Sequence, residues 1–314
     1  MPELPEVETI RSGLQHLTQH KVKEIFRSKF KLRIASTLDL SDLINQEIIS
    51  INRRARYLII NFTNNKSLII HLGMSGKITC SHDFQHLKHD HFACKFDILK
   101  PLQTQTNLLQ YIGDPRKVGR TLPSVKETKN IPKSKGLRYN SWLIYNDPRR
   151  FGFVDLIKTS EIKNHKMLSK LGCEPLDDDF NANYLQEELR NKKMNIKTTM
   201  MDNAIVVGVG NIYINESLFA SQISPLRNAC DLSKSEVTKL VNNIKKILQN
   251  AIDLKGSSIS DYTDALGNYG NFQSTFKTYG RSGEKCFNYK NCKSIIQQIR
   301  QNGRSTFYCP TCQK

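Results

Sequence analysis

The first residues of the chain combine a proline with two nearby acidic side chains. Pro2 follows Met1, Glu3 comes next, and Glu6 lies three residues further on. Removal of Met1 leaves Pro2 with a free secondary amine, and α-amino groups have a pKa near ~8, well below that of lysine. Such an amine is partly unprotonated at neutral pH and can attack an electrophilic carbon to form a Schiff base. The same residues also suit an ordinary helix start, since proline and acidic residues favour helix N-termini.

Four cysteines near the C-terminus have the spacing of a metal site. Five residues lie between Cys286 and Cys292, sixteen between Cys292 and Cys309, and two between Cys309 and Cys312. Two cysteine pairs on turns predict a tetrahedral Zn²⁺ site, which is structural because four thiolates leave no open position. Residues 281–314 carry seven Lys or Arg against one Glu, so this small module also suits contact with phosphates.

Two predicted turns carry side chains that suit the invasion of a DNA duplex. Met74 lies in a glycine-flanked turn, and Arg149 and Phe151 lie two residues apart in another turn. Enzymes that act on a duplex base extrude it and fill the gap, often with apolar side chains and an arginine. The alternative is that Met74 and Phe151 are ordinary core residues.

Two further features fit phosphate binding. The sequence G-V-G-N at 208–211 precedes a predicted helix, and helix N-terminal amides bind phosphate. Asn211 can equally serve as the N-cap of that helix. Arg304 lies between the cysteine pairs, at a predicted hairpin tip, where an ordinary solvated arginine is the alternative.

Composition supports a polyanionic partner. The chain has 314 residues, enough for about two domains, with 47 basic and 29 acidic residues and a net charge of +18. This balance favours nucleic acid over a membrane surface. No apolar run is long enough for a membrane span and no signal peptide is recognisable, so we expect a cytosolic protein. In that compartment the remaining cysteines should be buried thiols rather than disulfides; they are Cys80, Cys94, Cys173 and Cys230.

The periodicity of apolar residues changes along the chain. Residues 4–18 predict one amphipathic helix. Short β-branched and aromatic runs separated by polar turns then predict a β-sandwich or barrel; the runs are 22–30, 48–51, 57–62, 68–72, 91–96, 142–145 and 151–157. Residues 98–140 interrupt this pattern as a polar insertion. Within it, 113–119 partly echoes the D-P-R-R-F-G sequence at 147–152, which we take as the working copy.

From about residue 161 the pattern becomes helical. Asp177, Asp178 and Asp179 can cap a helix that runs through Leu189. Further helices are predicted at 197–201, 212–220 and 233–254, the last with a marked apolar face. The Gly/Ser/Asp-rich segment 256–274 is the candidate for a mobile lid.

Several motifs together resemble the bacterial formamidopyrimidine-DNA glycosylases. They occur in family order over nearly the whole chain outside the insertion. They are M-P-E-L-P-E-V-E-T at the start, R-R-A-R-Y-L at 53–58, H-L-G-M-S-G at 71–76, K-H-D-H at 88–91, D-P-R-R-F-G at 147–152, L-G-C-E-P-L at 171–176, V-V-G-V-G-N-I-Y at 206–213 and R-S-T-F-Y-C-P-T-C-Q-K at 304–314.

The resemblance implies a two-domain α+β fold. Residues 1–160 would form an N-terminal helix and β-sandwich, with 98–140 as an inserted loop. Residues 161–275 would form a helix–two-turn–helix domain, and 276–314 a zinc-finger β-hairpin with one Zn²⁺. Damaged double-stranded DNA would be bound between the domains by a monomer.

The resemblance also implies a base-excision repair enzyme that removes oxidised purines, such as 8-oxoguanine and formamidopyrimidines, and then nicks the strand. Matched position by position, Pro2 is the Schiff-base nucleophile, Glu3 the proton donor, and Glu6 a residue that shapes the active site. Met74, Arg149 and Phe151 would replace the extruded base. His89, Lys193 and Asn211 would contact DNA, with Lys197 beside them, and Arg304 would contact phosphate and act in δ-elimination.

Two positions depart from the family pattern. Arg56 stands where the family usually has a lysine described as a β-elimination proton donor and phosphate contact. We expect phosphate binding to survive and proton donation to weaken, because arginine does not readily give up its proton. The spacing of Cys286 and Cys292 is wider than the usual two-residue gap. Two other functions remain open: excision of oxidised pyrimidines, and DNA binding without catalysis.

Overall fold

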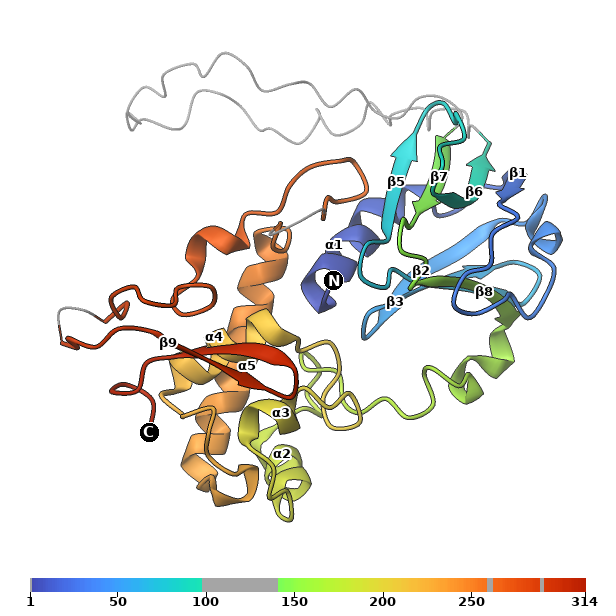
Figure 1. Cartoon of the computed structure of the whole chain (residues 1–314). Coiled ribbons are helices and arrows are strands. Elements are labelled where there is room, and N and C mark those ends of the chain that lie inside the picture. The colour runs from blue at the N-terminus through green and yellow to red at the C-terminus, as the bar shows by residue number, and fades with distance from the viewer. Residues whose placement is uncertain (1, 98–140, 259–261, 289–290) are drawn as a thin grey trace, which may run out of the picture.

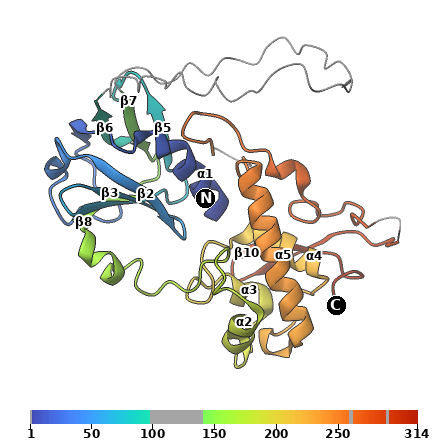
Figure 2. The same ribbon diagram turned by 180° about the vertical axis from the view of Figure 1, so that it is seen from behind.

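The computed structural model describes residues 2–97, 141–258, 262–288 and 291–314. A sandwich of sheets and a helical half lie on either side of the N-terminus, which is between them in both views (Figures 1 and 2). No helix in the described ranges is long and apolar enough to cross a membrane. The predicted insertion at 98–140, with its motif copy at 113–119, lies outside the described residues.

The N-terminal half is a helix packed on two four-stranded antiparallel sheets, which confirms the predicted sandwich. Helix α1 spans Leu4–Leu14 and is followed by a 3-10 turn, so it is shorter than the predicted helix at 4–18. The sheets have the orders β1-β6-β7-β5 and β2-β3-β4-β8. The strands are β1 Val22–Arg27, β2 Ile48–Arg54, β3 Tyr57–Phe62, β4 Lys66–His71, β5 Lys77–Ser81, β6 Asp90–Phe96, β7 Ser141–Asn146 and β8 Phe153–Lys158.

The core of this half lies between the sheets and under α1. Val7, Ile10 and Leu14 are buried with apolar side chains from both sheets, as their helical spacing predicts. Among the four cysteines expected to be buried thiols, Cys94 is buried, but Cys80, Cys173 and Cys230 are only partly buried. That expectation is therefore corrected for three of them.

In the described part of the C-terminal half there are four α-helices. They are α2 Ala182–Leu189, α3 Ile196–Met200, α4 Asn211–Ser221 and α5 Lys234–Asp253. Ser233 caps α5 through a capping box with Glu236, and the predicted apolar face of α5 is buried. The cap of α2 is Asn181, whose side chain accepts hydrogen bonds from two backbone amides, and not the aspartate run at 177–179. The predicted cap is therefore wrong by two residues.

A β-hairpin near the C-terminus packs on α4. Strands β9 (Gln297–Gln301) and β10 (Arg304–Tyr308) are joined by Asn302 and Gly303, both with positive φ. Such a two-residue turn matches the twist of a hairpin. The amide of Phe307 donates to Asn215 of α4 over 2.7 Å, so the hairpin is fixed at the start of that helix.

The segment that follows α5 returns to the N-terminal half. Tyr262 and Ala265 are buried in the core cluster beneath α1, and the amide of Cys80 donates to the Ala265 carbonyl over 2.8 Å. Residues 262–272, part of the segment considered as a lid, therefore connect the two halves by packing. Residues 259–261 of that segment lie outside the described residues.

Candidate active site and zinc centre

Glu3 occupies the junction between the two halves. Pro2 and Glu3 are both buried. The Glu3 carboxylate accepts a hydrogen bond of 2.8 Å from the backbone amide of Asn211, and the amide of Leu4 donates to the Gly208 carbonyl over 3.3 Å. A Cβ on Gly210 would lie 1.9 Å from the Glu3 carboxylate. The glycine is thus required for the N-terminus of α4 to reach this acid.

The structure assigns Asn211 a different place from the N-cap considered above. Gly210 is the N-cap of α4 and Asn211 is its first helical residue. Its side chain donates instead to the carbonyl of Ser305 in β10 over 3.0 Å. Asn211 therefore links the Glu3 carboxylate to the zinc-finger hairpin.

The environment of Glu3 favours its protonated form. The pKa of Glu3 is raised to about 7, mainly because the carboxyl is buried and also because the Glu6 carboxylate is nearby. The charge of Arg56 and the hydrogen bond from the Asn211 amide act in the opposite direction. A carboxylic acid with this pKa can gain or lose a proton near neutral pH, as general acid–base chemistry requires.

Glu6 holds the N-terminal segment in place. Its carboxylate accepts hydrogen bonds from the Glu3 amide over 2.8 Å, the Tyr213 hydroxyl over 2.5 Å and the Ser257 amide over 2.8 Å. Burial, together with the charges of Glu6 and Glu3, raises the pKa of Tyr213, so its hydroxyl keeps the donated proton. Glu6 thereby joins α1, α4 and the segment after α5 beneath the candidate nucleophile.

Lys197 of α3 brings a cationic group close to Glu3. Lys197 is buried and donates to the Ser305 carbonyl over 3.1 Å and the Thr306 hydroxyl over 2.7 Å. Burial and the neighbouring charge of Arg304 lower the pKa of Lys197 to about 8, although Glu3 opposes this shift. Arg304 is exposed at the start of β10, next to the hairpin turn, and Lys193 is exposed on the approach to α3.

Arg56 lies in the turn between β2 and β3. It is partly buried, and its positive charge lowers the pKa of Glu3. The turn begins at Ala55, whose φ of 53° lies in the left-handed region. The surroundings must therefore hold this backbone in place.

The Met74 turn and the Phe151 turn lie against each other. A Cβ on Gly73 would lie 2.5 Å from the Gly152 nitrogen, so the two turns meet backbone to backbone. Met74 is 46% exposed and Phe151 is 45% exposed, which excludes both from the core. The Arg149 guanidinium lies over the Phe151 ring, 4.7 Å from its centroid. The three side chains therefore form one exposed group, here termed the wedge.

Asp147 fixes the geometry of the wedge from below. This buried carboxylate accepts hydrogen bonds from the Ser75 hydroxyl over 2.6 Å, the Gly152 amide over 2.9 Å and the Tyr145 hydroxyl over 3.1 Å. Its own amide donates to the carbonyl of His89, a partly exposed residue beside the same turn. One carboxylate thus holds both turns in register.

The four cysteines of the C-terminal module form a compact cluster. Their sulfur atoms all lie within 4.8 Å of one another, and the Cys286–Cys312 and Cys292–Cys309 pairs are each 3.7 Å apart. Zn–S bonds of about 2.3 Å in a tetrahedron separate the sulfurs by about 3.8 Å. The residues therefore fit one structural zinc ion, and the wider Cys286–Cys292 loop does not prevent the cluster from forming.

Sequence reasoning did not single out several residues that organise the site. Tyr213, Asp147 and Glu174 stand inside the motifs quoted above, but their partners are distant in sequence and no periodicity connects them. Glu216 accepts hydrogen bonds from three consecutive amides at 277–279, where the chain enters the zinc module. A place inside a recognised motif is the one sequence signal that could have indicated the first three, and Glu216 lies outside those motifs.

Comparison with known proteins identifies the family. The family described as "Formamidopyrimidine-DNA glycosylase N-terminal domain" matches residues 1–121, "Formamidopyrimidine-DNA glycosylase H2TH domain" matches 171–263, and "Zinc finger found in FPG and IleRS" matches 283–314. The formamidopyrimidine-DNA glycosylase of Wolbachia pipientis wMel is 39% identical, with all of both chains covered. That of Acinetobacter baylyi is 37% identical, covering 100% of this chain and 98% of the other.

Solved structures agree with this. A complex of Lactococcus lactis Fpg with DNA containing an abasic site has a TM-score of 0.77 and 32% identity, with 99% of each chain covered. A complex of the wild-type L. lactis protein with DNA containing N7-Benzyl-Fapy-dG has the same TM-score and identity, with 100% of each chain covered. The chain therefore belongs to the formamidopyrimidine-DNA glycosylase family, with the helix and sandwich, the H2TH domain and the zinc finger of these DNA glycosylases.

Proposed function

We propose that this protein is a bifunctional DNA glycosylase and abasic-site lyase that excises oxidised purines through a Schiff base on Pro2. The observation that carries the proposal is the pair formed by Pro2 and Glu3. Glu3 is buried beside the nucleophile, held by the Asn211 amide, and has a pKa near neutrality. A proton-exchanging acid next to a terminal amine is what the reaction needs.

The chemistry follows from these two groups. The Pro2 nitrogen forms a bond to the sugar C1′ while the bond from C1′ to the damaged base breaks, and the base leaves with a proton. The Pro2 nitrogen then loses its own proton as the iminium forms, and O4′ takes up a proton as the sugar ring opens. The iminium acidifies the C2′ proton, so its removal expels the 3′-phosphate, and a second elimination expels the 5′-phosphate. Glu3 is the group placed to exchange protons at the sugar.

The surrounding residues fit DNA as the partner. Arg56, Lys197 and Asn211 lie around the same acid, Arg304 lies beside Lys197, and a net charge of +18 favours a phosphate backbone. On damaged duplex DNA, these cationic side chains would neutralise the phosphates on either side of the sugar that Pro2 attacks. His89 and Lys193 extend the proposed contacts along the strand.

The wedge provides a place for duplex invasion. Met74 and Phe151 would enter the stack left by the extruded base, and Arg149 would face the orphaned cytosine. We propose that the protein acts in this way as a monomer in the cytosol, on lesions such as 8-oxoguanine and formamidopyrimidines.

The lesion class is tested by excision assays on matched duplexes. The proposal predicts excision of 8-oxoguanine opposite cytosine, with strand cleavage on both sides of the lesion, and much weaker action on thymine glycol. The opposite ranking would assign the protein to oxidised-pyrimidine repair. Tight binding of both duplexes without excision of either would show a damaged-DNA-binding protein instead.

A further inference from the structure

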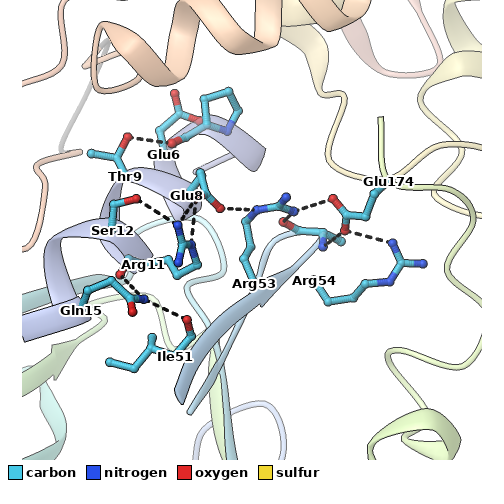
Figure 3. A network of polar contacts seen from close by, with 12 residues as sticks. Glu6, Glu8, Thr9, Arg11, Ser12, Gln15, Ile51, Arg53, Arg54 and Glu174 are labelled. Carbon is cyan, nitrogen blue, oxygen red and sulfur yellow. Dashed lines mark hydrogen bonds and ion pairs between the residues drawn. The ribbon is translucent and has the colours of Figure 1, made fainter. Parts of the chain in front are cut away.

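The motif L-G-C-E-P-L at 171–176 has no part in the proposed chemistry, yet its acid is one of the most heavily bonded in the molecule. The Glu174 carboxylate accepts hydrogen bonds from the Arg53 guanidinium over 2.7 Å, the Arg54 guanidinium over 2.9 Å and the Ala55 amide over 2.6 Å. Figure 3 shows both arginines directed at this carboxylate from the end of β2. Charge-assisted bonds of this kind are stronger and more directional than neutral ones.

The three donors are the three residues that immediately precede Arg56. Ala55 has a φ of 53°, an unfavourable conformation for a residue with a Cβ that persists only where surrounding contacts impose it. Arg54 reaches back to the Leu171 carbonyl over 3.0 Å and to that of Gly172 over 2.5 Å. The turn that carries Arg56 is therefore fixed to the 171–174 segment by bonds in both directions.

The same network reaches the helix that carries Glu3. Arg53 donates from Nε to Glu8 of α1 over 2.9 Å, and Glu8 also pairs with Arg11 over 2.7 Å (Figure 3). The side chains of Arg53 and Glu174 are each only 10% exposed, so water screens their ion pair weakly. Arg53 thus joins Glu174 on one side to Glu8 of α1 on the other, at the start of the turn that carries Arg56.

We propose that Glu174 is a positioning residue for Arg56, holding its turn so that the guanidinium faces Glu3 and the bound phosphate. This inference rests on the proposed function, because it assigns Arg56 to the DNA-bound site. The hydrogen bonds that Glu174 accepts within the described part of the chain come from Arg53, Arg54 and Ala55, and none comes from Glu3. The effect of Glu174 on the reaction passes through the turn.

A double-mutant cycle between Glu174 and Arg56 tests the inference. The variants are Glu174→Gln, Arg56→Ala and the two combined, each compared with the parent chain. The readouts are the single-turnover rate of strand cleavage at a preformed abasic site and the affinity for DNA with an uncleavable tetrahydrofuran site. We expect Glu174→Gln to slow cleavage about tenfold in the parent and less than about twofold in the Arg56→Ala background, since coupled residues are not additive.

Equal losses in both backgrounds would overturn the inference, because a general loss of structure does not depend on Arg56. Cleavage by Arg56→Ala at the parent rate would overturn it as well. Glu187→Gln is the matched control, since Glu187 is an exposed acid on α2 that pairs only with Arg190 among the described residues. It should change neither readout in either background.

A second variant covers the case in which Glu174→Gln does not fold. Arg54→Ala removes the bonds of Arg54 to Glu174 and to the Leu171 and Gly172 carbonyls, and leaves the bonds of Glu174 to Arg53 and Ala55. It should show the same non-additivity with Arg56→Ala, and an additive result would count against the inference. If the parent chain itself does not cleave abasic DNA, the proposed function fails; if the parent cleaves and the cycle is additive, only the role of Glu174 fails.

Discussion

At the scale of single residues, the two carboxylate oxygens of Glu3 have different surroundings. One carboxylate oxygen accepts the Asn211 amide, whereas the other is buried and has no hydrogen-bond partner among the described residues. A buried oxygen without a partner is costly, and protonation reduces that cost. The fold therefore favours the protonated form of this acid, which is the form that the proposed proton donation needs.

The pH dependence of base excision should report this acid. Because burial raises the pKa of Glu3 to about 7, Glu3 loses its proton as pH rises through that value. Base excision measured in single turnovers should then decline above about pH 7. Glu3→Gln cannot donate a proton, so it should lower the rate about 10²- to 10⁴-fold and remove this decline. A decline of the same midpoint in Glu3→Gln would show that another group titrates.

The raised pKa of Glu3 also makes the stability of the folded protein depend on pH. A carboxyl whose pKa is raised in the folded state stabilises the protein fully below its unfolded value of 4.5. That contribution is lost as pH rises to about 7. The stability of the parent relative to Glu3→Gln should therefore fall across this interval and stay level above it. Chemical denaturation at several pH values measures this difference.

At the scale of elements, two turns act as one because Asp147 bonds to both. The wedge side chains are exposed, so they gain no order from core packing, and their positions depend on the turns beneath them. Rigid support of this kind reduces the entropy lost when a side chain enters DNA.

Asp147→Asn should loosen the wedge. The amide would turn a donor toward the Ser75 and Tyr145 hydroxyls or the Gly152 amide, leaving buried donors unpaired at a cost of about 1–3 kcal/mol. The rate of base extrusion can be monitored by the fluorescence of a 2-aminopurine beside the lesion. It should fall about tenfold or more, because a small displacement of the wedge side chains lowers the rate strongly. Asp178→Asn, at an exposed acid, should leave extrusion unchanged. Normal extrusion by a folded Asp147→Asn would contradict this role.

The elements also show what the sequence could predict. The buried face of α5 follows from local pattern, and the structure confirms it, with Ser233 as the N-cap rather than the first helical residue. The sequence does not predict β5, since only Ile78 in that strand is a buried apolar residue. The cap of α2 is misplaced because an aspartate run and Asn181 offer equal capping chemistry, and the burial of Leu185 and Leu189 selects the latter.

The sequence predicts which residues form the candidate site, but it does not predict which residues they bond to. The motifs identify the residues around Glu3, but the bonds of Glu6 to Tyr213 and of Arg53 to Glu174 span 207 and 121 positions. No local pattern encodes such pairs, because they form only when the two halves pack together.

At the scale of the whole molecule, the two halves share their structural supports. Glu6 bonds to α4 and to the segment after α5, Ala265 enters the N-terminal core, and Asn211 and Lys197 bond to the zinc-finger hairpin. The site around Glu3 is therefore complete only when the sandwich, the helical half and the hairpin are all in place.

Zinc removal should dismantle one of these supports. Without the metal, only a small apolar cluster and a few hydrogen bonds to α3 and α4 would hold the hairpin, so β10 should loosen from Lys197 and Asn211. Cys309→Ser should lower zinc content well below one ion per chain and weaken binding to abasic-site DNA at least about tenfold. Cys230→Ser, a cysteine outside the cluster, is the control and should retain both. Unchanged affinity in zinc-free protein would contradict this link.

The central claim is that the terminal amine of Pro2 attacks the sugar, and borohydride trapping tests it most directly. The chain without Met1 is incubated with 8-oxoguanine DNA and sodium borohydride, and the cross-linked peptide is located by mass spectrometry. The expected product is a stable protein–DNA species whose adduct lies on the Pro2 nitrogen. Absence of any trapped species, or an adduct on a lysine such as Lys197, would contradict it.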